Sequence, residues 1–144
     1  MYLLDINVLI ALAWPSHVHH RLAQAWFQRK RYRGWATCPI TQTGFVRISS
    51  NPKFIDGAVS PGTAIGLLRG VTGAPDHSFW TDTLDITNET QMPSTHLLGH
   101  RQVTDAYLLA LAIYHKGKLA TLDGGIAALL TDTGLREKHL EIIP

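Results

Sequence analysis

The chain has 144 residues, of which 45% are hydrophobic and 17% charged, and it contains one cysteine. This length and composition are typical of a single folded domain, residues 1–144, and exclude a disordered chain or a disulfide-rich scaffold. The formal net charge of +2 hides a segment, residues 6–55, with seven Lys or Arg and no acid, which indicates either a polyanionic partner such as RNA or a solvated basic helix face.

The N-terminal segment MYLLDINVLIALAW is apolar but lacks the features of an export signal. It begins without Lys or Arg, and Asp5 and Asn7 interrupt the apolar run. No stretch of the chain reaches the roughly 18 apolar residues that are needed to span a membrane. We therefore expect a soluble, cytoplasmic protein with no membrane contact, in which residues 2–4 form a buried strand and residues 7–13 a helix.

Along the next part of the chain, segments with helical spacing of apolar residues alternate with short apolar runs. In the segment 17–32, for example, Val18, Leu22 and Trp26 share one helical face. The elements expected here, in chain order, are helix 17–32, strand 35–39, helix 40–50, a helix that starts at Pro61 and ends near residues 70–75, and strand 78–80. Residues 76–95 otherwise show no clear pattern.

The clearest segment runs from Val103 to Leu122. Thr104 is expected to cap a helix that extends to about His115 and is apolar over most of its surface, which is typical of a central packed helix. The elements expected after this helix are strand 119–122, a helix from Gly124 through Leu130, and strand 140–143. Apolar strands separated by helices predict an α/β fold in which a parallel sheet is covered on both faces.

Three aspartates fall where such a sheet binds ligands, beyond the carboxyl ends of its strands. Asp5 follows the first strand, Asp123 follows strand 119–122, and Asp105 opens the helix before that strand. Each could instead be a helix cap or a turn residue, but three acids in apolar surroundings are costly without a counter-charge. Because Mg²⁺ prefers carboxylate oxygens and can activate water for cleavage of a phosphodiester, we expect the three aspartates to hold a divalent ion.

The segments LLDINVLIAL and TDAYLLALAIYHKGKLATLD, with the spacing between them, resemble the PIN-domain family, and in particular its VapC-type toxins of type II toxin–antitoxin pairs. HVHHRLAQAWF and PITQTGFVRISSNP extend the resemblance over nearly the whole chain. The resemblance implies a three-layer α/β/α sandwich around a parallel sheet of roughly four to five strands. It also implies cleavage of RNA, with tRNA or another structured RNA as substrate, a Mg²⁺ or Mn²⁺ cofactor, a homodimer, and a cognate antitoxin protein as partner.

By position in these motifs, Asp5, Asp105 and Asp123 correspond to catalytic metal ligands of the family. Asn7 matches a polar residue two places after the first acid, and Thr104 matches the hydroxyl that precedes a later one. We therefore expect these two residues to support the site.

One departure from the family concerns a fourth acid. The family usually has a Thr-x-x-Glu pattern after the second strand, but residues 41–44 read TQTG, so Gly44 stands in place of the glutamate. Three carboxylates suffice for one Mg²⁺, and the loss leaves open whether a second ion binds. Gln42 and Asp82 are the other residues that could supply an oxygen ligand.

Basic residues in two regions are candidates for contact with RNA phosphates. Arg29 and Arg31 belong to the densest basic run of the chain, which could equally be the solvated end of a helix, whereas Arg47 and Arg101 are expected closer to the catalytic edge. Although the chain has eight histidines, no Cys pair or HExxH motif supports a zinc site.

Two other functions compete with the ribonuclease. Gly44 in place of the acid also fits a catalytically weak PIN scaffold that binds RNA or a partner protein. Phosphotransfer at acids that follow strands is disfavoured, because Asp5-Ile6-Asn7 lacks the second aspartate of a phosphatase-like start.

Overall fold

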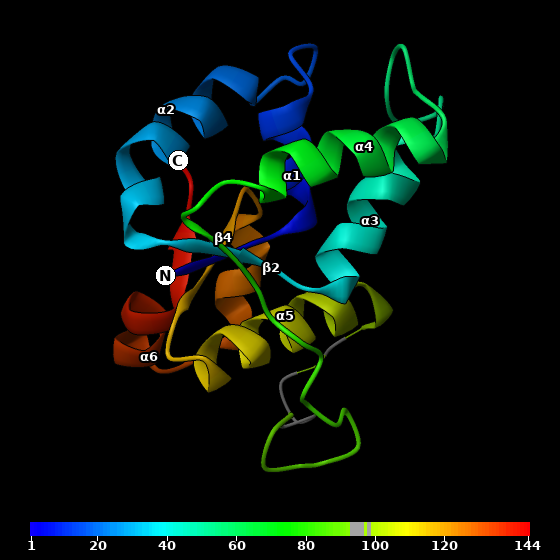
Figure 1. Cartoon of the computed structure of the whole chain (residues 1–144). Coiled ribbons are helices and arrows are strands. Elements are labelled where there is room, and N and C mark those ends of the chain that lie inside the picture. Colours follow the sequence, from blue (N-terminus) through cyan, green and yellow to red (C-terminus); the bar gives the residue numbers. More distant parts are fainter. Residues whose placement is uncertain (93–96, 98) are drawn as a thin grey trace.

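The computed structural model describes residues 1–92, 97 and 99–144. Within these residues, short strands form one sheet in which every neighbouring pair is parallel, in the order β3-β2-β1-β4-β5 (Figure 1). The strands are β1 (Tyr2–Leu4), β2 (Trp35–Thr37), β3 (His77–Phe79), β4 (Lys118–Thr121) and β5 (Leu140–Ile142). The predicted parallel sheet is therefore confirmed.

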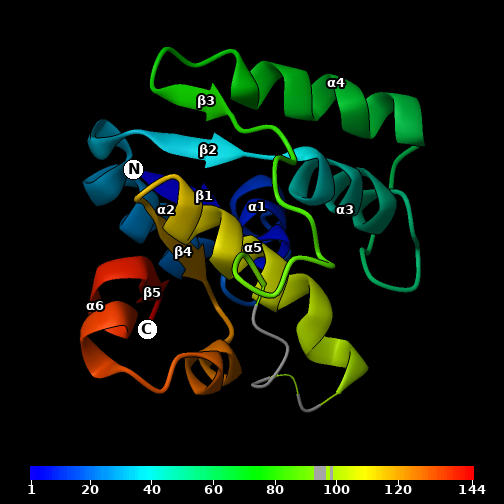
Figure 2. The ribbon, with the colours of Figure 1, turned by 90° about the horizontal axis from the view of Figure 1, so that it is seen from below.

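Helices cover both faces of the sheet and make three layers, as the family resemblance implies (Figures 1 and 2). One layer contains α5 (Val103–Tyr114) and α6 (Thr133–His139). The opposite layer contains α1 (Ile6–Ala13), α2 (His20–Lys30), α3 (Pro39–Ser49) and α4 (Pro61–Thr72). Short 3-10 helices are η1 (Arg31–Arg33), η3 (His100–Gln102) and η4 (Gly124–Leu129).

Alternation of side chains along the strands divides the core in two. Leu3 of β1 packs in a cluster with the buried face of α5, whereas Tyr2 and Leu4 pack in a second cluster with α1, α2 and α3. Leu119 and Ala120 of β4 divide between the two clusters in the same way. Because both faces are covered, the central strand β1 is apolar throughout, whereas the edge strand β3 carries His77 and Ser78.

The order of the strands changes direction beside β1. The chain moves from β1 through β2 to β3 on one side, and then returns to add β4 and β5 on the other side. In open parallel sheets, ligands bind beyond the carboxyl ends of the strands where the winding direction changes. Here that place lies beyond the ends of β1 and β4.

Some predicted boundaries were wrong, for local reasons. The second helix starts at His20 rather than residue 17, after the turn that Pro15 introduces, and its predicted last turn is the 3-10 helix η1. The segment after Asp123 is 3-10 rather than α-helical, and α6 was not predicted because Leu135 is its only apolar residue. Part of the stretch 76–95 that showed no pattern, residues 93–95, lies outside the described residues.

The fold also bears on the expectation of no membrane segment. Among the described residues, no helix combines the length and the apolar character that crossing a bilayer requires.

Candidate active site

The three aspartates lie beyond the carboxyl ends of β1 and β4, as predicted. Asp5 directly follows β1 and is only 5% exposed, Asp105 is half-buried in the first turn of α5, and Asp123 is exposed two residues after β4. Asp5 and Asp123 are close enough for their charges to interact, and both act on Asp105. The topology therefore brings Asp5 together with two carboxylates that are 100 and 118 residues away in sequence.

The hydroxyl of Thr121, the last residue of β4, joins this group. Its buried Oγ1 donates a hydrogen bond to Oδ2 of Asp5 over 2.7 Å. The same oxygen accepts from Nδ2 of Asn7 at 3.1 Å and from the backbone N–H of Asp123 at 3.0 Å. The side chain of Asn7 also accepts the backbone N–H of Leu122 at 3.1 Å. Asn7 therefore lies beside the aspartates, and its supporting role there stays a prediction.

Thr121 was missed by the sequence reasoning. The available signal was its position two residues before Asp123, because side chains two apart on an extended chain point to the same side. A buried hydroxyl at a strand end also needs partners, which an acid and an amide nearby can supply.

Two of the aspartates also have the structural role that was considered as an alternative. Oδ1 of Asp5 accepts the N–H of Ile6 at 2.6 Å and caps α1, and Oδ1 of Asp123 accepts the N–H of Gly125 at 2.8 Å at the start of η4. Asp105 differs, because it makes no hydrogen bond or ion pair with any residue in the described part of the chain. Its carboxylate is therefore the one that fold stability does not require.

Burial, and secondly the nearness of other acids, raises the pKa values of two of these aspartates. Burial raises the pKa of Asp5, against the hydrogen bonds from Thr121 and Ile6. Burial, followed by the charges of Asp5 and Asp123, raises the pKa of Asp105 to about 6. Carboxyl groups that share a site without a counter-charge respond in this way, and a bound cation would reverse the effect.

The donor chemistry fits a hard divalent cation, because oxygen ligands from carboxylates are those that Mg²⁺ and Mn²⁺ prefer. The arrangement is looser than a closed metal centre. Across residues 1–92, 97 and 99–144, no three His, Cys, Asp or Glu side chains have the spacing to share one ion. The aspartates thus lie within range of mutual repulsion without forming a compact ligand cluster.

An apolar contact explains the missing fourth acid. A Cβ atom at Gly44 would lie 2.8 Å from Cγ1 of Ile6 and nearer still to its Cδ1. The glycine therefore allows α3 to pack closely on α1, and Ile6 fills the space beside this position. A glutamate here would require Ile6 to move.

The two other candidate oxygen ligands are engaged elsewhere. The amide of Gln42 donates to Oγ1 of Thr37 at 3.0 Å, and that hydroxyl hydrogen-bonds His77 at 2.8 Å. Asp82 lies beside Tyr107, where burial and then the charge of Asp82 raise the pKa of the phenol. Neither Gln42 nor Asp82 is among the groups that act on Asp5 or Asp105.

The expected N-cap role of Thr104 was wrong. Helix α5 starts at Val103 directly after η3, so its cap is Gln102, which adopts helical angles and makes no side-chain cap bond. The 3-10 turn leaves no extended residue at the helix start, and an N-cap needs one. Thr104 is exposed next to Asp105, and its supporting role stays a prediction.

The four arginines divide between opposite edges of the sheet. Arg47, in the last turn of α3, and Arg101, in η3 just before α5, are exposed on helices at the carboxyl ends of the strands. Arg29 and Arg31 precede β2 and so lie at the amino ends, away from the aspartates. Arg31 is also held by Asp76 through bonds of 2.6 and 2.9 Å, with its guanidinium 5.2 Å from the Phe27 ring centroid.

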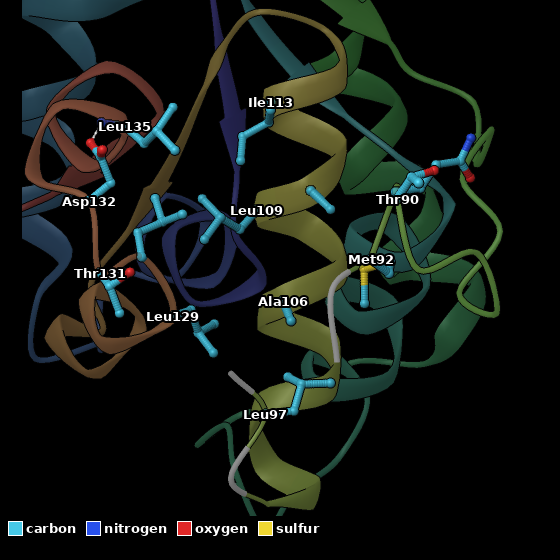
Figure 3. Close-up of a pocket in the computed structure, with 13 residues that line it drawn as sticks. Thr90, Met92, Leu97, Ala106, Leu109, Ile113, Leu129, Thr131, Asp132 and Leu135 are labelled. Carbon is cyan, nitrogen blue, oxygen red and sulfur yellow. Dashed lines mark hydrogen bonds between the residues drawn. The ribbon is translucent and has the colours of Figure 1, made fainter. Parts of the chain in front are cut away.

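A separate apolar groove of about 320 Å³ lies along the outer side of α5. Figure 3 shows Ala106, Leu109 and Ile113 of that helix on one wall, opposite Leu129 and Leu135. None of the three aspartates lines it.

Comparisons with known proteins agree with this architecture. Residues 2–129 match the PIN domain family. Ribonuclease VapC39 of Mycobacterium tuberculosis is 45% identical over 125 residues, covering 87% of this chain and 90% of the relative. Ribonuclease VapC44 of the same organism is 44% identical over 138 residues, covering 96% of each chain, and ribonuclease VapC38 is 42% identical over 129 residues, covering 90% of this chain and 89% of the relative. The chain therefore belongs to the PIN-domain family and, within it, to the VapC type.

Proposed function

We propose that this protein is a metal-dependent endoribonuclease that acts as the toxin of a toxin–antitoxin pair. The observation that carries the proposal is the meeting of Asp5, Asp105 and Asp123 at the switch point of a PIN-family sheet, where burial and then the charges of Asp5 and Asp123 raise the pKa of Asp105 to about 6. Relatives named ribonuclease VapC, at 42–45% identity over most of the chain, support RNA cleavage as the reaction.

In this proposal the three aspartates hold one Mg²⁺ or Mn²⁺. When bound, such an ion supplies the positive charge that activates water and stabilises the phosphodiester during cleavage. Thr121 and Asn7 keep Asp5 in place, because the Thr121 hydroxyl donates to Asp5 and Asn7 bonds that hydroxyl. Asp105 has no hydrogen bond among the described residues to hold it, so its side chain can turn towards the ion and release its proton.

A single ion is favoured over a pair. Two-metal sites need ligands for both ions, and the position of a fourth acid is occupied here by the contact between Gly44 and Ile6. The proposed partners are an RNA substrate, with tRNA or another structured RNA as the class, a cognate antitoxin and a second copy of the chain. The proposed location is the cytoplasm, where the buried Cys38 stays a free thiol.

The direct test is cleavage of a cellular RNA pool by the purified protein in Mg²⁺, Mn²⁺ or EDTA. We expect discrete, metal-dependent fragments from the native protein and none from Asp105→Asn. The matched control is Asp56→Asn, at an exposed loop aspartate that is not among the charges acting on Asp5 or Asp105, and it should cleave like the native protein. Equal cleavage by Asp105→Asn, or cleavage that persists in EDTA, would refute the proposal.

The second candidate is a PIN scaffold that binds RNA without cleaving it, and the apolar contact of Gly44 favours it. Thermal unfolding with millimolar Mn²⁺ separates the two, because an ion that binds the native state raises its stability. A rise in melting temperature for the native protein, absent from Asp105→Asn, supports the nuclease. RNA binding with neither a metal-dependent rise nor cleavage supports the scaffold.

A further inference from the structure

The edge of the sheet opposite the aspartates carries several exposed Lys and Arg side chains that have no acidic partner among the described residues. Residues at this edge lie just before the amino ends of β2, β4 and β5. We use the name amino-edge surface for a set of exposed side chains at this edge: Arg29, Tyr32, Arg33, Tyr114, Lys116 and Lys138. Figures 1 and 2 show this edge on the left, with the N-terminus, the end of α5 and helix α6, whereas α3 and the start of α5 lie on the right.

Two acids near this edge are already committed to other cations, whereas Glu137, next to Lys138, is exposed and forms no ion pair among the described residues. Asp76 pairs with Arg31 at 2.6 Å. Glu141 is shared by Lys30 at 3.2 Å and Lys118 at 3.4 Å, and it also accepts from the indole of Trp26.

The cations of the amino-edge surface are left without such partners. Arg29, Arg33, Lys116 and Lys138 form no ion pair with any acid in the described part of the chain. Four cations are therefore free to bind an anion from outside.

The strand order sets the spacing of these cations. Neighbouring strands lie roughly 4.8 Å apart, so the start of β2, two residues after Arg33, and the start of β4, two residues after Lys116, are separated by about 10 Å across β1. The start of β5, two residues after Lys138, lies about 5 Å further on. His139, next to Lys138, bonds the carbonyl of Gly117 at 2.8 Å and so fixes α6 beside the loop that carries Lys116. These three cations therefore precede strand starts that lie in a row.

Exposed aromatic rings accompany this row. Tyr32 is 72% exposed, with the guanidinium of Arg33 at 5.8 Å from its ring centroid, and Tyr114 at the end of α5 is 55% exposed. The dipoles of α2, α5 and α6 also favour cations at their C-terminal ends, but they give no reason for exposed tyrosines. Cations in a row with exposed aromatics match the backbone and the bases of a nucleic acid.

We propose that the amino-edge surface docks the phosphate backbone of a structured RNA while the aspartates at the opposite edge act on another part of the same molecule. The inference rests on the proposed function for the identity of the ligand. Along α5, Asp105 and Lys116 are separated by about 16 Å, at 1.5 Å per residue. An RNA must therefore exceed about five stacked nucleotides, at roughly 3.4 Å each, to reach both edges.

The test is equilibrium binding of pooled cellular tRNA in EDTA, which stops metal-dependent cleavage. The variant is Arg33→Glu with Lys116→Glu. Its matched control is Arg21→Glu with Lys53→Glu, which changes the net charge equally at two exposed residues away from this edge. We expect the variant to bind tRNA about tenfold or more weakly at 0.1 M salt, and the control to lose far less affinity. The slope of the logarithm of the binding constant against the logarithm of the salt concentration should be smaller by about two for the variant.

A neutral version guards against misfolding. Lys116 has a φ of 55°, which asparagine tolerates, so Arg33→Gln with Lys116→Asn removes the charges without straining the turn. This version should fold like the native protein and still bind tRNA more weakly. Equal affinity of variant and control, or a change in melting temperature without a change in binding, would overturn the inference and leave these cations a role at helix ends only.

Two further measurements distinguish RNA docking from binding of an acidic protein and from the proposed nuclease activity. Polyglutamate of similar charge should bind more weakly than tRNA, and equally tight binding at the same residues would overturn the inference in favour of an acidic protein partner. Cleavage of an oligonucleotide of about three nucleotides, which is too short to reach both edges, should be the same for the amino-edge variant and the control. Loss of tRNA binding in the variant supports docking even if no cleavage is found, in which case only the proposed nuclease activity fails.

Discussion

At the scale of single residues, the candidate site depends on one hydroxyl. Oγ1 of Thr121 reaches Asp5, Asn7 and the backbone of Asp123, and all three bonds lie between 2.7 and 3.1 Å. The bonds join β1, α1 and the turn after β4, which are far apart in sequence. A hydroxyl in this position both orients a candidate ligand and holds the end of the sheet together.

Thr121→Val should show both roles. The change keeps the shape but leaves the Asp5 carboxylate, the Asn7 amide and one backbone N–H without their partner, at a cost of about 1–3 kcal/mol in the free energy of unfolding. Chemical denaturation measures that cost, and RNA cleavage at a temperature where the variant is folded measures the loss of orientation. Thr121→Ser should restore most of both, and a valine variant as stable and active as the native protein would contradict the assignment.

Asp105 gives a prediction about pH. Its pKa is 3.8 in the unfolded chain and about 6 in the folded protein, so between these values the folded state binds more protons. The free energy of unfolding therefore falls as pH rises through this window, and the loss is complete above about pH 6.

Asp105→Asn escapes this loss because it cannot ionise. In EDTA, its melting temperature should exceed that of the native protein by a few degrees at pH 7 and should match it near pH 3.5. The Asp56→Asn control keeps Asp105 and should therefore follow the native protein at both pH values. A difference that is the same at both pH values would mean that burial and the neighbouring aspartates do not raise this pKa.

At the scale of elements, the packing of α1 on α3 decides which ligands the site can have. Gly44 brings α3 so close to Ile6 that the position of the family's usual acid becomes part of the hydrophobic core. The same helix α1 is capped by Asp5. The apolar contact and the acidic site are therefore built on the same turn of helix.

A double-mutant cycle measures this contact. Gly44→Ala should destabilise the protein by about 1–3 kcal/mol, because the new methyl group meets Ile6, even though alanine is the better helix former. Ile6→Ala alone leaves a cavity, but combined with Gly44→Ala it should cost less than the sum of the two. Strict additivity in urea denaturation would show that the two side chains do not compete for the space.

The elements that could be predicted are those whose pattern is local. Continuous apolar runs gave β1, β2 and β4, and helical spacing gave α3, α4 and α5, because burial on a covered sheet leaves these signals in short segments. The strand ends then located Asp5 and Asp123.

The features that could not be predicted depend on distant contacts. The bonds of Thr121 span 114 and 116 residues, and the pairing of Arg31 with Asp76 spans 45. No local pattern marks such a pair. Helix α6 was missed for a different reason, since its capping aspartate and charged surface leave almost no apolar periodicity.

At the scale of the whole molecule, charge is separated along the strand direction. Three carboxylates gather beyond the carboxyl ends, and a row of unpaired cations lies at the amino ends. A polyanion should therefore be attracted first to the amino edge. Only a long one can then also engage the aspartates.

This separation predicts different salt responses for long and short substrates. Cleavage of structured RNA under conditions well below saturation should fall steeply with added KCl, because several counterions are released on docking. Cleavage of an oligonucleotide too short to reach the amino edge should fall less steeply. Initial rates at three or four KCl concentrations and constant Mn²⁺ give both slopes, and identical slopes would contradict a docking surface at the amino edge.

Asp5 is both the cap of α1 and a candidate metal ligand, and this has a consequence for how the protein can be inactivated. Both of its oxygens accept hydrogen bonds, one at the start of α1 and one from Thr121, so Asp5→Ala removes a helix cap of about 1 kcal/mol as well as a carboxylate. The carboxylate of Asp105 has no such structural role, because it accepts no hydrogen bond from the described residues. In cells selected for loss of cleavage, inactivating mutations should therefore fall into two groups. Mutations at Asp105 should leave an abundant, folded protein that still binds its partners. Mutations at Asp5 or Thr121 should yield a less stable protein that is degraded by proteases.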